Sequence, residues 1–292
     1  MAVLVASGAF PGPPASQDLL LVGATDRLLV GPGVRLVVNP GSQPGKHARI
    51  LWRNEAVSAS ATTEAFGADA GNAITADTSQ YWQPTSYGAE LTIDLGQRRR
   101  VNCVGIGAHN ICTSGAQVQI ETEQTVGATP VVRATSSQTD DGAIMAFFPA
   151  ATVRLVRLWI IGPPVRIGHV SAGMTLDLPA PGYADHAPLT WGNTVTTRGL
   201  QSTQGWALDW VIEAQGLSGK YGFSHIPEAW IVEHLLPVKR AMQRGPFFIA
   251  GRPEADPWDC ALAWLSGDLV PQRMGLSDLC RFDLNLQGQA ND

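Results

Sequence analysis

Two tyrosines flank a short polar turn and could form a binding platform. Tyr81 and Tyr87 lie on either side of residues 83–86, a Gln-Pro-Thr-Ser turn whose proline leaves little conformational entropy to lose. A tyrosine ring offers an apolar face to a sugar ring, while its hydroxyl stays hydrated. His109 and Asn110 follow an apolar segment and could add polar contacts. Three interpretations stay open for these side chains: glycan recognition, contact with another subunit, or ordinary loop structure.

No residue spacing along the chain predicts a catalytic centre. Gly105-Ile106-Gly107 lacks the third glycine of a dinucleotide fingerprint, because Asn110 stands at that position. Phosphate-binding-loop, Gly-X-Ser-X-Gly and His-Glu-X-X-His motifs are absent from the sequence. Asp140-Asp141-Gly142 is typical of a turn, and neither His225 nor His234 is placed as a base. We therefore expect a protein that is not an enzyme and that binds no cofactor.

The cysteines do not predict a metal site. Cys103, Cys112, Cys260 and Cys280 form no Cys-X-X-Cys pair, and His109 supplies no second ligand at zinc spacing. We expect all four thiols to be reduced and buried, in a chain that folds in a cytoplasm.

The composition argues against two classes of function. A net charge of −5 and only 15% charged residues do not provide the basic face that nucleic-acid binding requires. No segment approaches the ~20 apolar residues of a membrane span. The N-terminus has no basic residue before its apolar stretch and is interrupted by prolines, so it does not resemble a signal peptide. We expect no nucleic-acid partner and no membrane insertion.

Short strands dominate the first two thirds of the chain. Leu91, Ile93 and Leu95 alternate with polar residues and predict one buried strand face. The apolar run 101–108 predicts a strand that is covered on both sides. Closely spaced strands without a convincing helix predict a β-sandwich. The expected strands are residues 90–95, 101–108, 117–121, 143–148, 152–161 and 166–174.

A proline-rich joint at residues 178–189 separates this region from a mixed second part. A strand at 206–213 places Trp206, Leu208, Trp210 and Ile212 on one face, and we expect most of the tryptophans to lie in cores. Strands also follow at 246–249, 258–265 and 279–286. In the last of these, Cys280, Phe282, Leu284 and Leu286 share one face.

The apolar periodicity of residues 227–243 predicts the single helix of the chain. Pro227 suits its first turn and Gly245 its end. Pro237 removes a backbone donor, so we expect a kink or a break there. The fold class is thus mainly β: a jelly-roll-like β-sandwich followed by a smaller β-rich domain with one helix. The expected divisions are an extended N-terminal segment (1–48), the sandwich (49–179) and an assembly domain (180–292).

The segment from Ala73 to Trp82, followed by residues 91–96 and 101–106, resembles the start of galactose-binding-like, or discoidin-type, domains. Asp77 matches the acidic loop residue of that family and Trp82 its aromatic residue. The resemblance implies a structural role for both, with Trp82 closing the end of the sandwich. It leaves Tyr81 and Tyr87 as candidate surface aromatics.

The second part resembles distal-tail and related minor tail proteins of long-tailed bacteriophages. The matching segments are residues 245–249, 257–264 and 282–288, with 166–173 before the joint. The resemblance implies a homo-oligomeric ring in the virion tail tip, with other tail proteins and a host-surface glycan as partners. We expect assembly through the C-terminal domain and the N-terminal segment.

Two other functions compete with this one: a free carbohydrate-binding module, and an accessory region of a glycosidase. The second is weakened by the lack of a paired-carboxylate motif.

Overall fold

The computed structural model describes residues 19–21, 27–29, 47–136, 140–179, 188–204, 206–253, 256–275 and 278–289. Residues 1–44 and 45–292 form two units, and each is described by itself. In the first unit, β1 (Leu19–Leu21) pairs antiparallel with β2 (Arg27–Leu29). Most of the N-terminal segment predicted at 1–48 lies outside the described residues.

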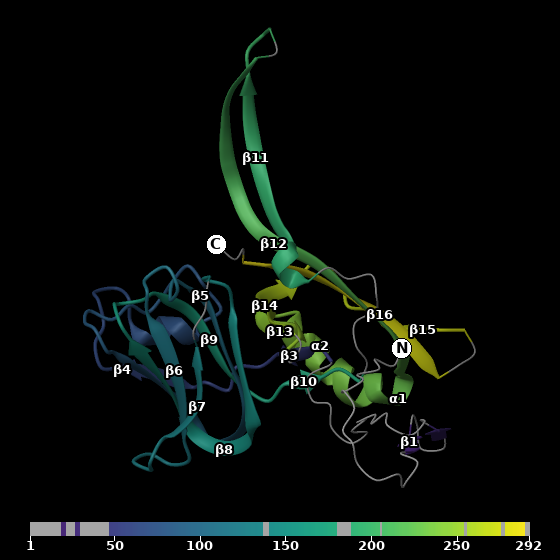
Figure 1. The fold of residues 1–292 in the computed structure, drawn as a ribbon, viewed down its shortest axis with the longest axis horizontal. Coiled ribbons are helices and arrows are strands. Elements are labelled where there is room, and N and C mark those ends of the chain that lie inside the picture. The colour runs from purple at the N-terminus through teal and green to yellow at the C-terminus, as the bar shows by residue number, and fades with distance from the viewer. Residues whose placement is uncertain are drawn as a thin grey trace, which may run out of the picture. The chain divides into compact units, whose positions relative to one another are not determined.

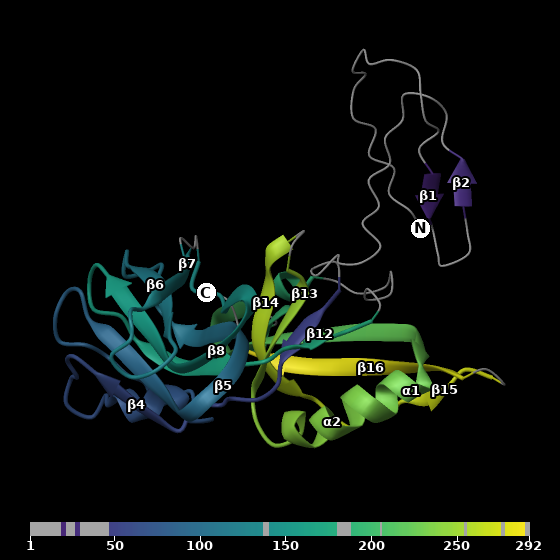
Figure 2. The same cartoon turned by 90° about the horizontal axis from the view of Figure 1, so that it is seen from below.

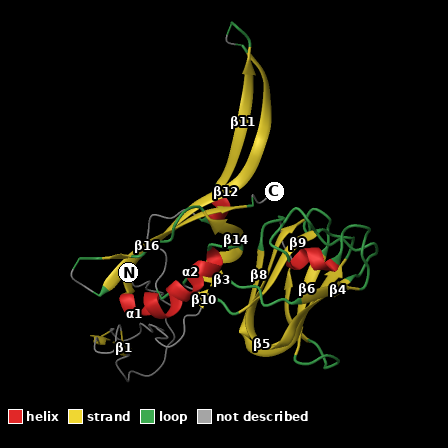
Figure 3. Ribbon diagram, turned by 180° about the vertical axis from the view of Figure 1, so that it is seen from behind, coloured by secondary structure: helices red, strands yellow, loops and turns green. Residues whose placement is uncertain are grey.

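The second unit is mainly β, so the predicted fold class is confirmed (Figures 1 and 3). Its first sheet has six strands in the order β4-β5-β8-β6-β7, with β9 beside β5. The strands are β4 (Ser58–Ala61), β5 (Glu90–His109), β6 (Gln117–Glu123), β7 (Val131–Ser136), β8 (Ile144–Ile161) and β9 (Ile167–Gly173). A 3-10 turn, η1 (Ala70–Ile74), precedes the loop that carries Trp82.

The two long strands β5 and β8 bend, so that the first sheet curves around one hydrophobic core. The first part of β5 pairs with the end of β8, and its last part pairs with the start of β8 and with β9. Register shifts between Asp94 and Arg99 and between Val101 and Cys103 interrupt the ladder in the middle of β5. Because such irregularities bend a strand without ending it, segments that were expected as separate strands are continuous here.

The expected burial of β5 is confirmed. Leu91, Ile93 and Leu95 are fully buried in the sandwich core. Beyond the bend, Ile106 belongs to the same core, whereas Cys103 packs with Phe248 in a separate cluster on the other side. The strand is therefore covered on both faces, as the apolar run 101–108 predicted.

The second sheet has eight strands in the order β10-β3-β13-β14-β16-β12-β11, with β15 beside β16. Ile50 pairs with Leu176, so residues 52–175 leave this sheet and return to it at neighbouring strands. Residues 49–51 and 176–177, which we had placed in the sandwich range 49–179, thus pair in the second sheet. Its strands are β3 (Arg49–Leu51), β10 (Leu176–Asp177), β11 (Asn193–Gln201), β12 (Ala207–Pro227), β13 (Phe247–Arg252), β14 (Asp256–Leu265), β15 (Gln272–Arg273) and β16 (Leu279–Gly288).

One helical segment runs along this sheet (Figure 2). It consists of α1 (Glu228–Trp230), a π turn (Ile231–Leu235) and α2 (Leu236–Met242), close to the predicted 227–243. The π turn ends two residues before Pro237. Because proline has no backbone N–H to donate to the helical hydrogen-bond ladder, the helix is distorted at this point, but it is not broken in two. Its buried residues share a core with Phe223, Phe282 and Leu284 of the sheet.

Candidate functional site

Trp82 organises one end of the sandwich. Its side chain is fully buried, and its indole nitrogen donates a 3.2 Å hydrogen bond to the carbonyl oxygen of Thr63. Its backbone exchanges two hydrogen bonds with Ile167, at 2.9 and 3.0 Å. Because neighbouring side chains in an extended segment point to opposite sides, burial of Trp82 turns Tyr81 and Gln83 outward beside Arg166.

A small cluster of partly exposed groups results. The Arg166 guanidinium lies 5.1 Å from the centroid of the Tyr81 ring, and its Nε donates to Gln83 Oε1 at 3.4 Å. The Arg166 backbone N–H donates to Asn110 Oδ1 at 2.6 Å. The side chain and backbone of Arg166 thus bring Tyr81 and Asn110 into one cluster. An aromatic ring stacked with a guanidinium can hold a flat ligand. Arg166 is a member that the sequence analysis did not single out.

His109 does not join this cluster. Its side chain is buried, its Nδ1 accepts the Ile111 N–H at 3.4 Å, and its Nε2 has no hydrogen-bond partner among the described residues. Asp141 lies 4.0 Å away and instead accepts the backbone N–H groups of Cys112 and Thr113. Burial lowers the pKa of His109 to about 4, although Asp141 opposes the shift. The imidazole is therefore neutral near pH 7, and its ring is shielded from solvent.

The other two predicted residues, Tyr87 and Asp77, lie outside this cluster. Tyr87 is 73% exposed and makes no hydrogen bond or ring contact within the described chain. Asp77 is exposed and accepts hydrogen bonds from the backbone and hydroxyl of Ser79, at 3.0 and 2.7 Å. These bonds hold the pKa of the Asp77 carboxyl below its usual value.

A long two-stranded arm is a second candidate surface (Figure 1). β11 pairs with residues 207–217 of β12, and the two strands extend beyond the remaining strands of the second sheet. Exposed apolar side chains lie on both faces of this arm: Val195, Trp210 and Ile212 on one, Leu200 and Val211 on the other, with Trp206 near the tip. The expectation that most tryptophans lie in cores is wrong, because five of the eight whose burial the structure describes are exposed: Trp159, Trp191, Trp206, Trp210 and Trp264.

The arm also has two open edges. In the described part of the chain, β11 pairs only with β12, and residues 207–216 of β12 pair only with β11. A two-stranded ribbon is at best marginally stable alone in water, and open edges invite pairing with further strands. The sequence at 193–201, with three threonines and one valine, was the signal for a strand that we did not predict.

A buried hydrogen-bond network fixes the base of the arm. Asp259, which is buried, accepts the Leu189 N–H at 2.6 Å and the Tyr221 hydroxyl at 3.2 and 3.1 Å through its two oxygens. Leu189 begins the turn η2 (Leu189–Trp191), which leads into β11, and Tyr221 lies on β12. Burial raises the pKa of the Tyr221 phenol, with Asp259 adding to the shift. The network joins both strands of the arm to β14.

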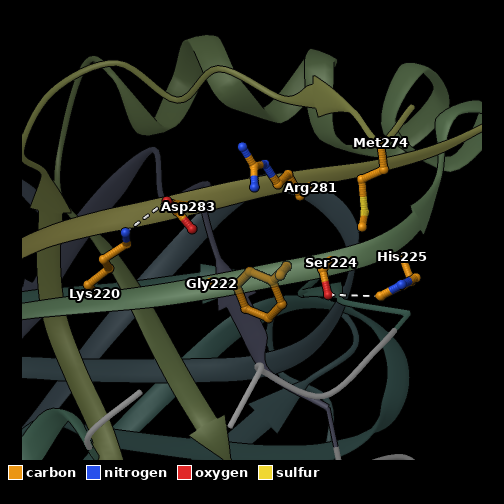
Figure 4. A pocket seen from close by; sticks show the side chains of 8 residues that line it. Lys220, Gly222, Ser224, His225, Met274, Arg281 and Asp283 are labelled. Carbon is orange, nitrogen blue, oxygen red and sulfur yellow. Dashed lines mark hydrogen bonds and ion pairs between the residues drawn. The ribbon is translucent and has the colours of Figure 1, made fainter. Parts of the chain in front are cut away.

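A cavity of about 520 Å³ lies over β12 and β16 (Figure 4). His225, in a left-handed conformation with φ 60°, accepts or donates a 3.0 Å hydrogen bond through Nδ1 to the Ser224 hydroxyl. Asp283, the only carboxylate among the lining residues, is paired with Lys220 at 2.9 Å and lies away from His225. Ser224, His225 and Asp283 therefore do not form a triad in this cavity.

The described residues provide neither a metal-binding cluster nor a membrane-spanning helix. No group of three or more His, Cys, Asp or Glu side chains is placed there to hold a metal ion. No helix in the described ranges combines the length and apolar composition needed to cross a bilayer. Cys103, Cys260 and Cys280 are buried free thiols, and Cys112 is half-buried.

No protein-family model matches the chain, and no curated protein matches it. Among solved structures, it is similar to a Ruminococcus gnavus GH29 fucosidase in complex with fucose, at 18% identity over 44% of this chain and 27% of that chain, with a TM-score of 0.37. It is also similar to the family 32 carbohydrate-binding module of C. perfringens NanJ in complex with galactose, at 18% identity over 43% of this chain and 98% of that one, with a TM-score of 0.36. A third similar structure is the family 32 module of AlyQ in complex with 4,5-unsaturated mannuronic acid, at 22% identity, 40% and 94% coverage and a TM-score of 0.35.

Proposed function

We propose that this protein is a structural subunit that assembles with copies of itself through the β11–β12 arm. The observation that carries the proposal is the arm, whose two faces carry exposed apolar side chains and whose two edges are open. Several large exposed apolar side chains gathered on one element are typical of an association site. The arm of a neighbouring copy can cover these apolar side chains and, at the same time, form backbone hydrogen bonds with the open strand edges.

The arrangement of the edges favours a ring. Because β11 and β12 run in opposite directions, the β11 edge of one copy can pair antiparallel with the β12 edge of the next. This contact joins two different surfaces, so it repeats around an axis and closes into a ring if the rotation fits.

We further propose that this ring belongs to a bacteriophage tail tip, which assembles after the chain folds in the host cytoplasm. The segments that resemble distal-tail proteins, residues 245–249, 257–264 and 282–288, fall largely on β13, β14 and β16, which are adjacent in the second sheet. This adjacency supports a common assembly domain, with other tail proteins as further partners and the sandwich displayed on it.

Light scattering coupled to size exclusion tests the assembly. The wild-type protein should have a mass several times 31.0 kDa and form rings in negative-stain micrographs. A Trp210→Ser, Ile212→Ser double variant should be monomeric, whereas Phe66→Ser, at a fully exposed position of the sandwich, should assemble normally. A monomeric wild type, or assembly that survives the double variant, contradicts the proposal.

Glycan binding by the sandwich is a second candidate function, and the Tyr81–Arg166 pair supports it. Tyr81→Ala should remove binding on a glycan array and leave assembly intact, and Tyr87→Ala should change neither. Loss of assembly in Tyr81→Ala would show instead that the Tyr81 side chain makes a contact between subunits.

A further inference from the structure

The outer face of the first sheet carries an exposed aromatic side chain between polar ones. Trp159 of β8 is 39% exposed and pairs with Glu90 of β5 on one side and with Gln119 of β6 on the other. Residues directly opposite each other in antiparallel strands share a face of the sheet. Glu90, Trp159 and Gln119 therefore form a row across three strands, on the side away from the sandwich core.

The next row along the strands contains a guanidinium. Arg157 pairs in register with Thr92 of β5 and Glu121 of β6. Its Nη2 lies 2.6 Å from Glu123 Oε2, and its Nη1 lies 3.5 Å from Glu90 Oε1. A single cation thus serves two carboxylates.

Arg157 does not satisfy all the carboxylate oxygens on this face. Glu121 accepts one hydrogen bond, from Gln119 Nε2 at 2.6 Å, and has no basic partner within the described ranges. Glu123 is fully buried, and its Oε1 has no hydrogen-bond partner there. Glu90, Glu121 and Glu123 face one guanidinium, that of Arg157, so three negative charges are opposed by one positive charge.

We propose that this sheet face binds an amine-bearing saccharide, a glucosamine oligomer in chemical class. The inference rests on the proposed glycan binding by the sandwich and adds the sheet face as a second site, apart from the Tyr81 loop. A sugar ring stacks its apolar face on the Trp159 indole and donates its hydroxyl groups to Glu90 and Gln119. Its ammonium group is attracted by Glu121 and by the face of the indole.

The ligand must be longer than a single sugar to use the whole face. Trp159 and the position of Glu123 are four residues apart along the strands, which corresponds to about 13 Å at ~3.3 Å per residue. An oligosaccharide that lies along β8 can therefore stack on Trp159 at one end and extend past Glu121, whereas Glu123, which is fully buried, contributes only its charge.

Isothermal titration of the full chain with a glucosamine tetramer and its N-acetylated counterpart tests the proposal. The free-amine tetramer should bind more tightly, and added salt should weaken it. Trp159→Ala should lower the affinity at least tenfold for both ligands. Glu121→Gln should lower it for the free-amine tetramer alone. Far-ultraviolet circular dichroism and an unchanged thermal transition should show that both variants keep the wild-type fold.

The outcomes separate this inference from the function it rests on. If Tyr81→Ala abolishes binding while Trp159→Ala leaves it unchanged, the sheet face is not the site but the sandwich still binds glycan. Equal affinity for the two tetramers overturns the amine preference. If neither tetramer binds and a glycan array is also blank, glycan binding itself is refuted.

Discussion

The indole of Trp210 lies across Gly199 on the neighbouring strand of the arm. The two residues are directly paired, and a Cβ added at Gly199 would come within 3.0 Å of the ring. Glycine leaves the strand without a side chain of its own, and the aromatic ring of the opposite residue covers the gap. The ring still remains 62% exposed, which leaves most of it available to a neighbouring copy.

Gly199→Ala should weaken assembly without unfolding the subunit. The added methyl group must push the Trp210 ring away from the arm, so the shape of the exposed face changes. We expect a lower oligomer fraction in sedimentation velocity and an altered tryptophan emission spectrum. Gly216→Ala is the matched control, since its nearest neighbour, the Gly288 carbonyl oxygen, would be at 3.4 Å. Identical sedimentation of the two variants would show that the ring position is irrelevant to assembly.

Trp82→Ala should strongly destabilise the sandwich. The substitution removes a fully buried indole and its hydrogen bond to Thr63, and replacement of a buried Phe or Trp by Ala typically costs about 3–5 kcal/mol. Chemical denaturation measures the loss. Tyr87→Ala, at a 73% exposed position of the same loop, should change the unfolding free energy by less than about 0.5 kcal/mol. A Trp82 variant as stable as this control would contradict a structural role.

Gly105→Ala should disturb the contact between the two sheets. A Cβ at this position would lie 2.5 Å from the Phe248 ring, which belongs to β13. Overpacking of this kind typically costs about 1–3 kcal/mol. Calorimetry should show a lowered transition, and Gly105→Ala combined with Phe248→Leu should recover part of the loss because the smaller side chain makes room. No recovery in the double variant would place the damage elsewhere.

Stability should fall as the pH is lowered from 6.5 towards 4. Burial lowers the pKa of His109 from 6.5 to about 4, so in this interval the unfolded chain binds a proton that the native state excludes. The stability contributed by the neutral imidazole is present above pH 6.5 and lost on acidification, by roughly 3 kcal/mol at most. The pKa of His169 is also lowered by burial, and it acts in the same direction.

Urea denaturation at pH 7.5 and 4.5 measures this effect. His109→Gln should reduce the difference between the two pH values. The carboxyls of Asp77 and Asp94 have pKa values below 3.8, because of hydrogen bonds to Ser79 and Arg154 respectively, and their contribution is lost at still lower pH. An unchanged pH dependence in the His109 variant would assign the effect to other groups.

Much of the fold is readable from local alternation. Two predicted strand faces are buried: the one shared by Leu91, Ile93 and Leu95, and the one shared by Cys280, Phe282 and Leu284. The candidate loop was less predictable. Tyr81 and Asn110 do come together, but through Arg166, which is 85 positions from Tyr81 in sequence and has no local pattern to mark it.

What the sequence determined by itself is the mainly β fold class, the helix at 228–242 and the apolar face of the alternating strands, because a period of two or 3.6 residues is a local property. Only the tertiary structure decided which faces meet water. The same alternation buries Leu284 under a helix and leaves Ile212 exposed on an arm. It likewise decided that His109 is buried and that residues 52–175 are inserted between β3 and β10, since both depend on contacts between segments far apart in the chain.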